Sequence, residues 1–103
     1  MKVMKLNATR QKSYYGKAKV IEHDGIIYLK SYNTIVCAID HDKVLRFWDG
    51  YSATTMKHID DFMILFGLNA ISSKDWKSLP VEQSSKIPYE VNKIPMSFSC
   101  SYY

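Results

Sequence analysis

The side chains best suited to catalysis or metal binding are few and scattered in this sequence. The histidines His23, His41 and His58 form no His-x-x-x-His pair, and no Cys-x-x-Cys occurs, so the spacing of a metal site is missing. Asp40-His41-Asp42 could hold a cation, but its polar character favours a solvated turn. The four glycines are dispersed and form no phosphate-binding loop. The sequence therefore predicts a non-enzymatic protein with no catalytic residue, no metal and no cofactor.

A second group of side chains is suited to an anionic partner. Residues 1–20 carry six basic and no acidic side chains, whereas residues 21–103 carry eight basic and ten acidic ones. Basic side chains neutralise phosphates, and aromatic rings stack on bases. The candidate partner- or nucleic-acid-binding residues are Arg10, Lys12, Tyr14, Tyr15, Lys17, Lys19, Tyr28, Lys30, Tyr32, Arg46 and Trp48.

Each of these features has a plainer structural interpretation, which stays open at this point. Lysines on an edge strand discourage aggregation. The tyrosines of the sheet could close its second face against the C-terminal tail, in place of facing solvent. The high aromatic content also suits a protein-binding module, because aromatic side chains dominate interface hot spots as well as small cores.

Composition narrows the class of protein. At 103 residues the chain is long enough for one domain with a core, and 47% of its residues are hydrophobic. No apolar run approaches the ~20 residues of a membrane helix, and no apolar stretch follows the basic start as it would in a secretory signal. Cys37 lies in an apolar run and Cys100 in a Ser/Tyr-rich tail, so two reduced thiols are expected, with a bridge as the minor alternative. These features predict a cytoplasmic protein.

The elements that must position the candidate residues come from hydrophobic periodicity. Alternating residues predict an antiparallel meander of four strands over residues 13–22, 26–32, 34–39 and 43–48. Asp24-Gly25 predicts a tight turn between the first two strands, and Asn33 permits the next turn. On the second strand, Tyr28, Lys30 and Tyr32 are expected to share one face, which could face solvent and bind a nucleic acid.

The period then changes to that of a helix over residues 53–66. Its apolar face is made of Met56, Ile59, Phe62, Met63 and Phe66. Ser52 is the expected N-cap, Gly67 the expected end, and Lys57, Asp60 and Asp61 are expected to lie toward the opposite side. The three hydroxyls of Ser52, Thr54 and Thr55 could also bind a phosphate at the helix start, although capping is favoured.

A short second helix is predicted over residues 73–79, and it completes an α+β domain of residues 1–79. Residues 80–103 contain all three prolines and form a tail. The apolar content of this tail favours partial packing over disorder.

One stretch resembles a known group of proteins. Tyr32-Asn33-Thr34-Ile35-Val36 and the segment Tyr51-Ser52-Ala53-Thr54-Thr55-Met56-Lys57-His58-Ile59 with Phe62 are similar to short uncharacterised proteins of phages, plasmids and integrative elements of Gram-positive bacteria. The resemblance covers roughly residues 13–79 and transfers no contact residue. Accessory proteins of such elements include anti-CRISPR proteins.

The resemblance implies a counter-defence protein that binds a type II RNA-guided nuclease of the bacterial host, or its guide RNA, and obstructs the loading of guide RNA or DNA. The alternative is a small DNA- or RNA-binding accessory protein of a phage or plasmid. Neither role involves a membrane. The oligomeric state stays open, with a homodimer among the options.

Overall fold

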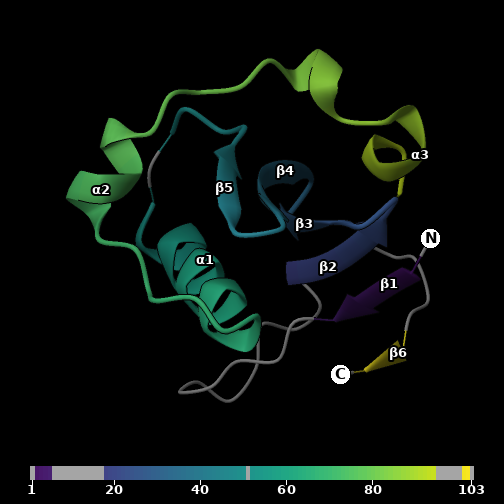
Figure 1. Ribbon diagram of the computed structural model, residues 1–103, viewed down its shortest axis with the longest axis horizontal. Coiled ribbons are helices and arrows are strands. Elements are labelled where there is room, and N and C mark those ends of the chain that lie inside the picture. The colour runs from purple at the N-terminus through teal and green to yellow at the C-terminus, as the bar shows by residue number, and fades with distance from the viewer. Residues whose placement is uncertain (1, 6–17, 51, 95–100, 103) are drawn as a thin grey trace.

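The computed structural model describes residues 2–5, 18–50, 52–94 and 101–102. Its sheet has the strand order β5-β4-β3-β2-β1-β6 (Figure 1). Strands β1 to β5 pair antiparallel, and the short β6 pairs parallel with β1. The strands are β1 (Lys2–Lys5), β2 (Ala18–His23), β3 (Ile26–Ser31), β4 (Thr34–Asp40), β5 (Lys43–Arg46) and β6 (Ser101–Tyr102). The helices are α1 (Ala53–Leu65), α2 (Ser73–Ser78), the 3-10 turn η1 (Ser84–Lys86) and α3 (Tyr89–Asn92).

The predicted α+β class is confirmed, but the predicted number of strands is too small. Five strands pair antiparallel where four were expected, because β1 holds only four residues and shows too little alternation to be recognised. Within the predicted first strand, the described part begins at Ala18, and residues 13–17 lie outside the described residues. The predicted last strand ends two residues early, at Arg46.

Two turns set the geometry of the meander. Asp24 and Gly25 have φ values of 52° and 80°, as the predicted Asp-Gly turn requires. At the next turn the left-handed residue is Tyr32, with φ 55°, and not the expected Asn33. Strand β3 therefore ends at Ser31, so Tyr32 leaves the alternation of Tyr28 and Lys30.

Helix α1 covers one face of the sheet (Figure 1). The predicted apolar side of the helix is confirmed, since Met56, Ile59, Phe62 and Met63 are buried and Phe66 packs beside them. The hydroxyl of Ser52 accepts a hydrogen bond from the Thr55 N–H at 3.1 Å, which confirms the N-cap. Gly67, with φ 81°, follows the helix as expected. The sheet side of this core is formed by Met4, Ala18, Val20, Leu29, Val36, Cys37 and Ile39.

A bulge in β4 explains why the consecutive residues Val36 and Cys37 both belong to the α1 side. Leu29 pairs with Cys37 while Lys30 pairs with Ile35, so Val36 is the extra residue. The alternation restarts after it, and Ala38 returns to the other face. Cys37 is fully buried as predicted, and burial raises the pKa of its thiol far above the usual range. Cys100 lies outside the described residues.

Residues 80–94, which we call the C-terminal strap, pack on the opposite face of the sheet. The strap carries η1 and α3 and runs along the side away from α1 (Figure 1). Its Ile87, Val91 and Ile94 are buried in a second core. The sheet contributes Val3, Ile21, Tyr28, Ile35 and Ala38 to that core. The molecule therefore has three layers, and the described part of the predicted tail is packed.

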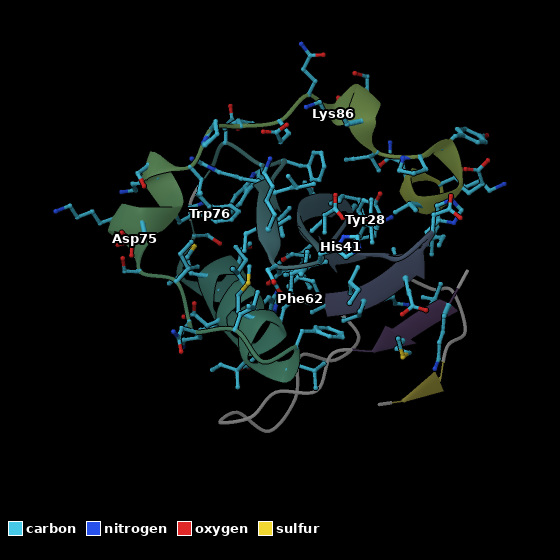
Figure 2. All side chains as sticks on the ribbon, viewed as in Figure 1. Tyr28, His41, Phe62, Asp75, Trp76 and Lys86 are labelled. Carbon is cyan, nitrogen blue, oxygen red and sulfur yellow. The ribbon has the colours of Figure 1, made fainter. Side chains whose placement is uncertain are left out.

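Helix α2 is held to the sheet edge by Trp76. The indole is fully buried and points from α2 toward the sheet, while its neighbour Asp75 points outward (Figure 2). Its Nε1 donates to the Gly50 carbonyl at 3.2 Å. A Cβ at Gly50 would lie 2.6 Å from the ring of Trp48, so glycine is needed there. Among the described residues, no helix has the length and apolar character needed to span a membrane.

Candidate nucleic-acid interface

Three lysines align across neighbouring strands at one end of the sheet. Lys19 in β2 pairs with Lys5 in β1 on one side and with Lys30 in β3 on the other. Because residues directly opposite on antiparallel strands point to the same face, the three positions form one row. The row lies on the strap side, since Tyr28, two residues before Lys30, belongs to the strap-side core. We call these three positions the lysine row.

The described side chains of this row are buried. Lys19 is 1% exposed and Lys30 is 4% exposed. The Lys30 Nζ donates a hydrogen bond to the carbonyl of Ile94, at the end of the strap. Burial lowers the pKa of Lys30, and the positive charge of Lys19 lowers it further. Like charges directly opposite each other are unfavourable in a sheet, and an anion beside them reduces their repulsion.

The two strands that flank the rest of the basic N-terminal segment meet at this end of the sheet. Strand β1 ends at Lys5 and β2 begins at Ala18, and the two strands lie side by side. Residues 6–17 join the two strands in the sequence and lie outside the described residues. Their sequence includes the basic residues Arg10, Lys12 and Lys17. We call the lysine row together with these three residues the basic end.

The structure places the predicted binding residues in three groups. Arg10, Lys12, Tyr14, Tyr15 and Lys17 lie outside the described residues. For Tyr28 and Lys30 the solvent-facing alternative is wrong, because the strap covers that face and Tyr28 is 3% exposed. Lys19 is buried as well. The Tyr28 ring instead packs 6.5 Å from that of Phe47. The plainer interpretation is therefore correct for Tyr28 and Lys30, because the C-terminal tail covers their face of the sheet.

Tyr32 is exposed, at 42%, but it does not share a face with Tyr28. Its left-handed turn places the ring 5.8 Å from the ring of His58, on the α1 side. Arg46 and Trp48 are also withdrawn from solvent, since Arg46 is 6% exposed and Trp48 packs against the α1-side core. The Arg46 guanidinium lies over the Trp76 ring, 4.9 Å from its centre, and bonds to carbonyls of α2. Arg46 therefore holds α2 against the end of β5.

A buried polar cluster at the start of α1 was not predicted as a unit. The Ser31 hydroxyl lies 2.8 Å from His58 Nδ1 and 3.3 Å from the Thr55 hydroxyl. A serine beside a histidine is the arrangement of an activated nucleophile. Ser31 is 2% exposed and His58 1%, so a substrate cannot approach the pair in this fold. The cluster joins α1 to β3.

The sequence offered one sign of this cluster. Thr55 and His58 are three residues apart and therefore lie on the same side of the helix. Asp61, three residues further on, is also buried, which corrects its expected place on the outer side. The apolar pattern could not show this, because Ser31 and the helix meet only in the folded chain.

Replacing Lys30 with methionine should remove a pH-dependent contribution to stability. The pKa of Lys30 lies below its usual 10.5 in the folded state, so between the two values the unfolded chain binds more protons. The free energy of unfolding of the wild type should therefore gain from Lys30 as pH rises toward 10.5. Denaturant unfolding from about pH 7 to about pH 10 checks this.

The difference in unfolding free energy, wild type minus Lys30→Met, is expected to grow over that range. The pKa of Tyr28 is raised, chiefly by burial, but this residue titrates in both proteins, and so its effect largely cancels. A difference that does not change with pH would show that Lys30 feels no penalty for its charge.

Comparison with known proteins identifies the family. Residues 1–78 match the model of a protein family described as a family of unknown function (DUF8033). The chain belongs to this family. No curated protein and no solved structure gives a significant match. The DUF8033 segment includes the sheet strands β1 to β5, α1 and α2, and it ends before the strap.

Proposed function

We propose that this DUF8033 protein is a non-enzymatic binding protein that engages a nucleic acid through the basic end of its sheet. The observation that carries the proposal is the charge of residues 1–20, which carry six basic and no acidic side chains. The strand register pairs the positions of Lys5, Lys19 and Lys30, and the sequence between β1 and β2 includes Arg10, Lys12 and Lys17. An array of closely spaced cations is complementary to the regularly spaced phosphates of a nucleic acid.

The net charge of the rest of the chain supports the basic end as the binding site. Beyond residue 20 the chain carries two more acidic than basic side chains, so the excess positive charge of the protein belongs to its N-terminal fifth. A potential concentrated at one end steers an anionic partner toward that end. Charge spread evenly over the surface would give no preferred orientation.

The counter-defence role is the finer form of this proposal. The guide RNA of a type II nuclease is a polyanion, and a protein that occupies it first would keep it from the nuclease. The resemblance of residues 13–79 to mobile-element proteins supports this form. A DNA- or RNA-binding accessory role needs the same basic end and no nuclease.

The proposal is tested by fluorescence titration of a labelled single-stranded oligonucleotide at several salt concentrations. We expect binding whose affinity falls steeply with salt, because each phosphate contact releases a counterion, with a slope of about 0.7 per contact for single strands. Binding that is absent, or indifferent to salt, would contradict it.

A cleavage assay with a purified type II nuclease separates the two forms. The inhibitor form requires strong inhibition when the protein meets the guide RNA before the nuclease does, and little when the guide is already loaded. Salt-dependent binding to the oligonucleotide with no inhibition in either order assigns the accessory role.

A further inference from the structure

The sheet face beneath the strap carries the groups found on single-strand-binding sheets. Tyr28 and Lys30 alternate on β3, and Lys19 lies opposite Lys30 on β2. The ring of Phe47 lies 6.5 Å from that of Tyr28. Aromatic rings on a sheet stack on bases, while neighbouring cations meet the phosphates. We call these four side chains the covered face.

The strap is attached to this side of the sheet mainly through side chains, among them Glu90, whose Oε2 lies 4.0 Å from His23 Nε2. Its last described backbone bond to the sheet is from the Glu82 N–H to the Arg46 carbonyl. From residue 83 to residue 94, the described backbone hydrogen bonds all run within the strap itself. Three side chains, Ile87, Val91 and Ile94, provide its buried apolar contacts. A segment held by a few side chains and no backbone ladder opens more readily than a strand of the sheet.

The polar contact at the end of the strap uses the same lysine that a phosphate would use. Lys30 donates to the carbonyl of Ile94, a neutral acceptor, while its charge is buried beside Lys19. A phosphate carries a full negative charge and is a stronger acceptor for the Lys30 ammonium than a neutral carbonyl. Exchange of the strap end for a phosphate would thus strengthen the hydrogen bond that Lys30 donates.

The residues that match the family model include the covered face and exclude the strap. Tyr28, Lys19, Lys30 and Phe47 lie within the DUF8033 segment, which ends at residue 78. The strap begins two residues after that end. The matched family region therefore includes the candidate binding groups and leaves out the segment that hides them.

We propose that the covered face is the surface that contacts single-stranded nucleic acid, and that the strap competes with the nucleic acid for it. This inference rests on the proposed function and adds the surface and its regulation. While the strap is in place, the basic end attracts the single-stranded nucleic acid. Displacement of the strap then exposes Tyr28 and Phe47 to bases and Lys19 and Lys30 to phosphates.

The first test loosens the strap. Val91 is fully buried on the strap, so Val91→Ser weakens the packing of the strap and changes no residue of the covered face. We expect the variant to bind a labelled single-stranded oligonucleotide about tenfold more tightly than the wild type at equal salt, because less strap packing opposes binding. Met63→Ala, in the α1-side core, is the matched control and should leave the affinity unchanged.

Adding Lys30→Met to Val91→Ser should abolish the tenfold gain, because a phosphate contact is lost along with the strap contact. Equal affinity of Val91→Ser and wild type, or gains of the same size in Met63→Ala, would overturn the inference while the proposed function stood. Binding by none of the forms would overturn the proposed function, and the inference with it.

Hydrogen exchange on the wild-type protein gives a second measurement that needs no variant. On addition of the same oligonucleotide, the amides of residues 86–94 should lose protection, while those of α1 keep it. Unchanged or increased protection of residues 86–94 in a saturated complex would contradict displacement of the strap.

Discussion

Replacing Arg46 with alanine is expected to lower the free energy of unfolding by about 3–5 kcal/mol, since several buried carbonyls would lose a charged donor. The guanidinium Nε donates to the Trp48 carbonyl at 2.8 Å. Its Nη1 donates to the carbonyls of Trp76 and Leu79, at 3.0 and 3.2 Å. One side chain thus fastens the end of β5 to α2 and to the residue just before the strap.

Denaturant unfolding of Arg46→Ala measures this loss, and Arg46→Lys is the control. Lysine keeps the charge and the alkyl stem, but its single ammonium cannot reach both sets of carbonyls as the planar fork does. The lysine variant should therefore be intermediate in stability. A loss below about 1 kcal/mol for alanine would mean that solvent or other donors satisfy these carbonyls.

Replacing Phe62 with alanine should cost a similar amount, about 3–5 kcal/mol, through lost burial and the cavity left behind. Phe62 is fully buried in the middle of α1 and lies in the core against the sheet (Figure 2). Its ring meets the edge of the Phe66 ring, with centres 5.3 Å apart. The packing of α1 against the sheet therefore depends on the Phe62 ring.

Phe66→Ala is the matched control, because it removes the same number of atoms from a partly exposed position one turn later. We expect it to lower the free energy of unfolding by clearly less, about 1–2 kcal/mol. Thermal or denaturant unfolding of both variants provides the comparison. Equal losses of unfolding free energy would show that the buried Phe62 ring stabilises the fold no more than the partly exposed Phe66 ring.

The parts of the fold predicted correctly from the sequence are those governed by local rules. The spacing of Met56, Ile59 and Phe62 predicted α1 and its buried side, because a helix repeats its faces within a few residues. Asp24-Gly25 and Ser52 likewise act on their immediate neighbours, as a turn and a cap. Antiparallel order followed from the short connections between strands.

The prediction went wrong where burial depends on a distant segment. Alternation places Tyr28 and Lys30 on one face but does not say what covers it. The apolar residues Ile87, Val91 and Ile94 did indicate packing of the tail, but the sequence could not show which surface they cover. The burial of Lys19 beside Lys30 could not be foreseen, since lysine is seldom buried and register is a property of the folded sheet.

The most direct test of the basic end removes the charge of residues 6–17. The triple variant Arg10→Gln, Lys12→Gln, Lys17→Gln changes no residue of the described strands or of the two described cores. If each residue makes one phosphate contact, affinity for a single-stranded oligonucleotide should fall about 100-fold near 0.1 M salt, and the salt slope should decrease by about 2. The control Lys43→Gln, Lys74→Gln, Lys77→Gln removes the same charge from β5 and α2.

Titration of both triple variants against salt decides the question. We expect the full loss of affinity for the first variant and a small loss for the control. Equal losses in the two variants would mean that total charge, and not the basic end, binds the nucleic acid, and the central claim would then be wrong.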